Sequence, residues 1–177
     1  MTESAVRYAR EGNTWFIILV GDLRYNTMAP AINYLVDKVL AGPPNANIVV
    51  DVTQATNVDS TCVGLLARLA SGSYNDGNND IPRPIMVAND GDTRDLLTAI
   101  AFESLYDFID AADNPIDDKV VSKMESAPNV DLNHKDMRML ILDAHRRLCA
   151  LDAKTNNIFE NVVIALEADI PNEPGNY

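Results

Sequence analysis

The sequence predicts an α/β fold, in which helices pack on a single, mostly parallel sheet of five strands and a C-terminal helical extension follows. Short runs of β-branched and aromatic residues, at 14–20, 48–52 and 84–88, are typical of buried strands. Between these runs, apolar residues recur at the spacing of amphipathic helices. Since strand–helix–strand units cross over in the right-handed sense, alternating elements of this kind place their strands in one mostly parallel sheet.

Composition indicates a globular protein without a membrane segment. The chain has 177 residues, of which 47% are apolar and 23% are charged, enough for one domain, or for a domain of about 110 residues with an appendage. The longest apolar run, 15–20, is far below the ~20 residues of a membrane helix. The N-terminus has no secretory-signal pattern. With Cys62 and Cys149 far apart in the sequence, we expect reduced thiols and a cytoplasmic location.

The charge of the chain argues against a nucleic-acid partner. The net charge is −12, and the only notable basic pair is Arg146 and Arg147. Phosphate contacts need a basic face, so we expect no nucleic-acid binding. The acidic residues fit either a solvated surface or attraction of a basic protein partner, and the sequence leaves both open.

The first elements are two strands and a helix. Residues 6–10 form a short edge strand, Gly12 and Asn13 a hairpin-type turn, and 14–20 a second strand. A helix begins at about Thr27, and Pro30 near its first turn is harmless because the N–H it lacks has no partner there. Its buried stripe consists of Ile32, Leu35, Val36, Val39 and Leu40, and a Gly-Pro-Pro sequence at 42–44 ends it.

The central unit of the chain is the strand at 48–52 with the helix that follows. The small polar residues at 53–57 predict a short loop, and Asp59 and Ser60 are good N-cap residues for a helix. The stripe of that helix consists of Cys62, Leu65, Leu66 and Leu69.

The remaining elements complete the predicted sheet. A loop at 71–83 leads to a strand at 84–88, a short helix at 93–101 and a last strand at 105–109. We place the first domain at residues 1–110.

The last third predicts a linker and a helical hairpin. Residues 111–132 contain Pro115 and Pro128 and one turn of helix around 118–125, and the prolines favour an extension that stands apart from the sheet. The extension, 133–170, holds one helix at about 133–152 and another at about 155–169, joined as a hairpin or as a bend in one helix. The apolar faces, which need a cover, consist of Met137, Leu140, Ile141, Ala144, Leu148 and Leu151 in the first helix and Ile158, Phe159, Val162, Val163 and Leu166 in the second. The cover could be the chain's own sheet, a second copy or a partner; we favour a homodimer or partner contact.

The central unit resembles the signature of STAS domains, a family that includes bacterial anti-sigma factor antagonists. Asp59, Ser60, Thr61 and Gly64 match the family's Asp-Ser-Ser/Thr-Gly-Leu-Gly pattern, and Cys62 stands where the family has its first glycine. A second strand that ends in Gly, an acidic residue and Leu, here residues 21–23, is also usual in STAS domains. The resemblance covers roughly residues 14–110.

The resemblance implies a phosphorylation-switched protein that binds other proteins. In the family the second hydroxyl residue is modified, which corresponds to Thr61, although Ser60 stays open as the modified residue. The partner-binding residues implied are Asp22, Asp59, Ser60, Thr61, Cys62 and Gly64. The unmodified chain would bind a kinase-type anti-sigma factor, a serine/threonine protein kinase that carries the ATP, and a PP2C-type phosphatase would be a further partner. The chain itself would hold no cofactor, and we expect Thr61 to be exposed.

Two other functions stay open: a structural STAS subunit of a sensory assembly or transporter, and a small nucleotide-binding protein or enzyme. The sequence has neither a G-x-G-x-x-G motif nor a P-loop, and we do not expect an enzyme.

Other reactive side chains have structural interpretations as well. His134 and His145 fit surface or helix-packing positions. A helix N-terminus would lower the pKa of the Cys62 thiol, but no histidine precedes residue 134 to serve as its base. Asp51 could meet Asp22 and Asp59 in a magnesium site, although a hydrogen-bonded strand-end role is favoured.

Overall fold

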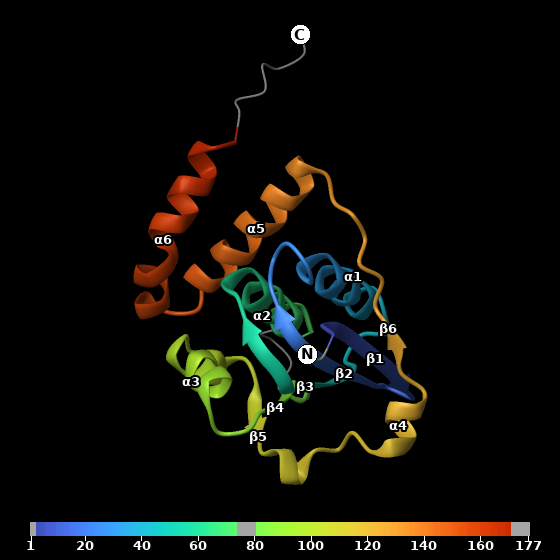
Figure 1. The fold of residues 1–177 in the computed structure, drawn as a ribbon. Helices are drawn as coiled ribbons and strands as arrows, with labels where there is room; N and C mark the ends of the chain where they lie inside the picture. Colours follow the sequence, from blue (N-terminus) through green and yellow to red (C-terminus); the bar gives the residue numbers. More distant parts are fainter. Residues whose placement is uncertain (1–2, 74–80, 171–177) are drawn as a thin grey trace.

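The computed structural model describes residues 3–73 and 81–170, and in them six strands form one mixed sheet (Figure 1). The order of the strands across the sheet is β5-β4-β3-β2-β1-β6. The strands are β1 (Ala5–Glu11), β2 (Thr14–Leu23), β3 (Asn47–Val58), β4 (Ile85–Val87), β5 (Asp107–Ile109) and β6 (Glu125–Ser126).

The predicted α/β class is confirmed, while the five-stranded sheet matches only roughly. Strands β2 to β5 are parallel to one another, but β1 pairs antiparallel with both β2 and β6. The sixth strand has only two residues, both exposed, so no apolar pattern in the sequence predicts it. Because β6 pairs with β1, the prediction that the first strand lies at the edge is wrong.

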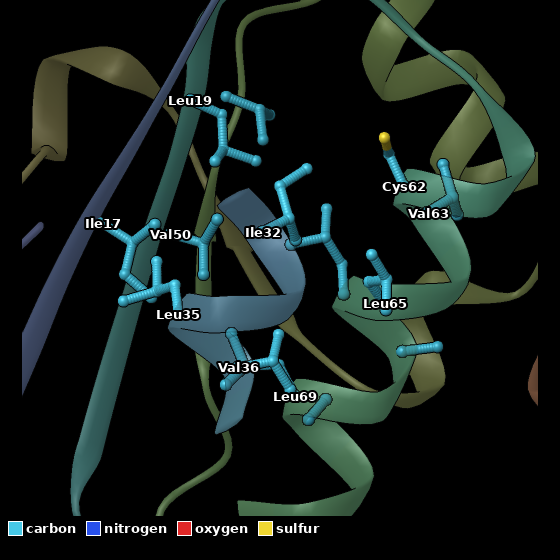
Figure 2. Packing of buried hydrophobic residues seen from close by; sticks show 14 of the residues in the cluster. Ile17, Leu19, Ile32, Leu35, Val36, Val50, Cys62, Val63, Leu65 and Leu69 are labelled. Carbon is cyan, nitrogen blue, oxygen red and sulfur yellow. The ribbon is translucent and has the colours of Figure 1, made fainter. Parts of the chain in front are cut away.

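One face of the sheet carries the main core. Tyr8, Ile17, Val50 and Met86 are paired across neighbouring strands, and paired residues lie on the same face. The helices α1 (Ala29–Leu40) and α2 (Ser60–Ser73) pack on this face, with their predicted apolar stripes inward (Figure 2). The proline of α1 lies in its first turn, as predicted.

The other face is covered by the segment between β5 and β6, which contains α4 (Asp118–Ser122). Arg7, Ile18 and Asp51 are paired across β1, β2 and β3 on this face. Arg7 donates a hydrogen bond to the carbonyl of Val121 (3.4 Å), and Asn114 donates one to Asp51 (2.7 Å). The turn of helix predicted near 118–125 is therefore present, within a segment that is packed on the sheet.

The remaining short elements are the α-helix α3 (Asp92–Ala99) and the 3-10 helices η1 (Phe102–Ser104) and η2 (Ala111–Asp113). The buried Tyr106, which follows η1, donates a hydrogen bond to the carbonyl of Leu66 in α2 (2.6 Å). This bond ties the end of the sheet that contains β5 to the central helix.

The C-terminal extension is a hairpin of α5 (His134–Cys149) and α6 (Ala153–Ala168). The two helices are capped by Asn133 and Asp152, whose side chains accept from first-turn amides, and the chain turns between them at 150–152 rather than at 154–156. Helix α5 packs on α2, and α6 packs on α5 (Figure 1).

The expectation that the extension stands apart from the domain is wrong for α5. Leu148 of α5 belongs to the main core, with Leu140 partly buried against it. Helix α6 keeps three large apolar side chains at least 39% exposed: Ile158, Val162 and Ile164. Dimerisation through these helices stays a prediction.

Two predicted segments lie partly or wholly outside the described residues. Within the predicted loop 71–83, helix α2 continues to Ser73, and 74–80 are not described. Pro171, Pro174 and Gly175, which predict a frayed end of the chain, are also outside the described residues. None of the helices in the ranges 3–73 and 81–170 is long and apolar enough to cross a lipid bilayer.

Candidate functional site

The candidate site surrounds the N-terminus of α2, where β2 and β3 end. Strand β3 runs through the segment predicted as a loop, 53–57, and pairs with β2 as far as Leu23 and Val58. This ladder contains two register shifts, between Ile18 and Val20 and between Gly21 and Asp22. The loop prediction is therefore wrong, because tertiary pairing with β2 overrides the weak strand preference of small polar residues. Only Asp59 connects β3 to α2.

Asp59 holds the site together. Its Oδ1 accepts a hydrogen bond from the backbone N–H of Cys62 (2.9 Å), as an N-cap side chain does. Its Oδ2 accepts from the backbone N–H of Tyr25 (2.6 Å), in the connection between β2 and α1. One carboxylate thus fixes the start of α2 and the loop beside it, and the predicted cap is confirmed for Asp59.

Asp22 lies at the same end of the sheet, at the end of β2. It accepts hydrogen bonds from the side chains of Asn57 in β3 (3.0 Å) and Arg24 (2.7 Å). The hydrogen bond from Asn57, followed by that from Arg24, lowers the pKa of the Asp22 carboxyl below its usual value. Asp22 is therefore a charged, outward group beside the first turn of α2.

Ser60 is the first residue of α2, and its hydroxyl lies 2.9 Å from Nε2 of His145 in α5. The other ring nitrogen, Nδ1, lies 2.7 Å from the carbonyl oxygen of Ile141. Because a carbonyl only accepts, Nδ1 carries the proton when the ring is neutral, and Nε2 accepts from Ser60. The ring is buried and lies edge-on to Phe159 of α6 (centroids 5.8 Å apart).

Sequence reasoning placed His145 only as a surface or helix-packing residue, and the packing role is confirmed. The hydrogen bond between His145 and Ser60 was not predicted, although the position of His145 in its helix indicated that it could be buried. His145 follows Ala144 and lies four residues after Ile141, so it borders the predicted apolar stripe of its helix.

Thr61 is buried, with a relative exposure of 3%, so the prediction that it is exposed is wrong. At helical spacing Thr61 shares a face of α2 with Leu65 and Arg68. These two residues line a cavity of about 270 Å³ together with residues of α1 and α5: Asn33, Asp37, Leu140, Asp143, Ala144 and Arg147. The side chain of Thr61 therefore lies near the junction of three helices.

Gly64 allows α5 to approach α2 closely. A Cβ atom built on Gly64 would lie 2.7 Å from Cα of Ala144 and closer still to its carbonyl oxygen. Side-chain Cβ atoms essentially never come this close to a neighbouring backbone. Here the glycine of the motif serves the chain's own helical extension.

Cys62 is an inert thiol in this fold. It is fully buried, and desolvation, followed by the charge of Asp59, raises the pKa of the thiol far above its usual value. The expected lowering by the helix N-terminus is wrong because burial and a neighbouring carboxylate both favour the neutral thiol. This argues against a nucleophile at Cys62.

Asp51 is a hydrogen-bonded strand residue, as favoured from the sequence. It is buried and accepts hydrogen bonds from the backbone N–H of Thr53 (2.8 Å) and the side chain of Asn114 (2.7 Å). In the part of the chain that the structure describes, no group of three or more His, Cys, Asp and Glu side chains is arranged to hold a metal ion.

The structure thus divides the six predicted site residues into two groups. The first turn of α2 gathers Asp22, Asp59 and Cys62. There the charges of Asp59 and Asp22 both raise the pKa of the Cys62 thiol. Ser60 and Gly64 belong to the side of α2 where α5 packs, and Thr61 is buried in the same first turn. Comparison with known proteins adds no assignment, since no family model and no curated protein matches the chain.

Proposed function

We propose that this chain is a protein-binding regulator of the STAS type, switched by phosphorylation at the N-terminus of α2. In this proposal it acts as an anti-sigma factor antagonist, and its unmodified form binds a kinase-type anti-sigma factor. The observation that carries the proposal is the placement of two hydroxyl residues, Ser60 and Thr61, directly after Asp59. Asp59 accepts hydrogen bonds from Cys62 and Tyr25, and at the same end of the sheet Asn57 of β3 donates one to Asp22 of β2.

The chemistry of this position suits a switch. A phosphate adds about −1.5 to −2 charges. The first turn of a helix tolerates an anion because its N–H groups and the helix dipole are positive there. On Ser60 the added charge would stand beside His145 of α5, and on either residue it would change the face of α2 that a partner meets, with little change to the sheet.

The proposal keeps Thr61 as the first candidate for modification and Ser60 as the second. Thr61 is buried, and Ser60 is partly buried with its hydroxyl bonded to His145. Under this proposal a kinase reaches either hydroxyl only after α5 has moved.

A nucleotide-binding function has less support. The cavity at the carboxyl ends of β3 and β4 has a volume of about 240 Å³, and two carboxylates, Asp90 and Asp92, are among its lining residues. Carboxylates repel the phosphates of a nucleotide, and ligand pockets are usually about 300–1,000 Å³.

The test combines site mapping with partner capture. Mass spectrometry of the protein purified from its source cells should find phosphate on residue 60 or 61. The unmodified protein should capture an ATP-binding protein of the kinase type, and Ser60→Glu or Thr61→Glu should lose it. The matched control is Thr56→Glu, because Thr56 is exposed on the nearby end of β3. Stable binding of a nucleotide by the isolated chain, or capture that both glutamate variants retain, would contradict the proposal.

A further inference from the structure

The residues proposed for the switch lie against the C-terminal hairpin. Ser60 is hydrogen-bonded to His145, Gly64 admits the backbone of α5 at Ala144, and Thr61 is buried. The hydrogen bond and the close backbone approach thus agree that α5 lies on the N-terminal half of α2, the half that contains the buried Thr61. A protein that approached this face would meet α5 first.

The two helices of the hairpin differ in burial: α5 buries Leu142, Ala144, His145 and Leu148, whereas α6 buries little. Within α6 the one buried residue is Thr155, and three large apolar side chains of that helix are exposed. A cavity of about 270 Å³, partly open to solvent, lies at the junction of α1, α2 and α5. Segments with few buried contacts open at a lower free energy than the global fold and often open as a unit.

The connection to the hairpin permits such an opening. Between β6 and α5 lies an irregular segment, 127–133, in which Val130 is 47% exposed. Asn129 in this segment donates a hydrogen bond to the carbonyl of Thr27 (2.7 Å). The pairing of β6 with β1 ends at Ser126, before this segment, so a rearrangement of the segment does not require a change in the sheet.

We propose that the α5–α6 hairpin is an autoinhibitory cover, closed over Ser60, Thr61 and Gly64, which opens as a unit to expose them. His145 acts as the latch by accepting the Ser60 hydroxyl, and Ala144 fills the space that Gly64 leaves. The regulatory meaning rests on the proposed function, whereas the closing and opening of the hairpin do not.

A buried cysteine reporter tests the cover directly. In Thr61→Cys, the introduced thiol reports access to the switch site during pulses of N-ethylmaleimide under native conditions, with each cysteine followed by peptide mass spectrometry. Gly64→Ala in the same chain wedges α5 away from α2, because the added methyl group meets backbone atoms of Ala144. We expect the introduced thiol to react about tenfold faster in the wedged variant, the factor that corresponds to about 1.4 kcal/mol of opening free energy.

Two controls use the same Thr61→Cys protein. Gly72→Ala makes the same chemical change in α2, but its methyl group meets the flexible side-chain end of Leu40 in α1, so the labelling of the introduced thiol should not change. The native Cys62, fully buried in the core, should stay as slow in both variants as in Thr61→Cys alone.

Three results would overturn the proposal. Equal acceleration of the introduced thiol and of Cys62 by the wedge would show that the hairpin completes the core and cannot open separately. No acceleration of the introduced thiol would show that α5 does not control access. Labelling of that thiol at the rate of an unfolded peptide in the unwedged chain would show that the site is not covered at all.

Hydrogen exchange of the unmodified protein answers the same question without a wedge, in case Gly64→Ala does not fold. The amides of α5 and α6 should exchange through a shared opening and at least about tenfold faster than those of β2 and β3. Equal protection of the hairpin and the sheet would reject the cover. Neither experiment uses a partner or a kinase, so their failure is distinct from failure of the proposed function, which phosphate mapping and capture test.

Discussion

The hydroxyl of Ser60 and Nε2 of His145 lie 2.9 Å apart, although 85 positions separate them in the sequence. The histidine is held in place by the carbonyl of Ile141 and by the ring of Phe159. This contact joins the first residue of the central helix to the C-terminal hairpin. It makes the extension part of the candidate site.

Replacing His145 by alanine should lower the free energy of unfolding by about 1–3 kcal/mol, because Ser60 loses its acceptor and a buried ring leaves a cavity. Urea denaturation measures the change. His134→Ala is the matched control, since His134 is exposed at the start of the same helix. This substitution should change the free energy of unfolding by no more than about 0.5 kcal/mol. Equal stability of the two variants would mean that the Ser60–His145 contact contributes nothing measurable.

Asp59→Ala should lower the free energy of unfolding by about 1–2 kcal/mol, since the first turn of α2 loses its cap and Tyr25 loses its acceptor. Asp59→Asn should cost less, because the amide oxygen can still accept one of the two bonds. Thermal and urea denaturation of both variants check the order. Asp131→Ala, at an exposed position outside the helices and strands, is the control. A loss as small as that of Asp131→Ala would show that the cap is dispensable.

The two cysteines should differ strongly in reactivity. Iodoacetamide at pH 8 should modify Cys149, which is partly exposed, long before Cys62, which is fully buried. Burial raises the pKa of both thiols, but only for Cys62 is the rise large, and the thiolate is the reactive form. Peptide mass spectrometry after timed labelling gives the two rates. Faster modification of Cys62 than of Cys149 would contradict this prediction and support Cys62 as a reactive thiol.

Asp152 should make the stability of the protein depend on pH in acid. Hydrogen bonding to Thr155, whose backbone N–H donates to the carboxylate (2.6 Å), lowers the pKa of the Asp152 carboxyl below 3.8, its value in an unfolded chain. A lowered folded-state pKa means that the stabilisation is present above about pH 4 and is lost as the pH falls through the folded-state value.

Asp152→Asn should therefore flatten the dependence of stability on pH below about pH 4, because an asparagine cap carries no titrating group. Urea midpoints at several pH values between 6 and 2 compare the variant with the parent. Asp131→Asn should leave the slope unchanged. An unchanged slope in Asp152→Asn would show that this cap does not contribute to acid sensitivity.

Local signals were enough to predict most of the regular elements. The stripe of Cys62, Leu65 and Leu69 lies inward in α2 as its spacing indicates, and Asp59 caps that helix. These features were predictable because helix periodicity and capping depend on residues within a few positions of one another.

The tertiary structure alone decided the candidate site. The amino-acid sequence by itself determined which residues form the motif, but the partner of Ser60 lies on a helix 85 positions later, and the burial of Thr61 depends on the packing around α2. The strand in place of the 53–57 loop likewise depends on pairing with β2, and β6 exists only because β1 offers an open edge. Exposure and hydrogen-bond partners are properties of the packed chain. Contacts across a long sequence separation are set by the summed packing of whole elements, which no short pattern encodes.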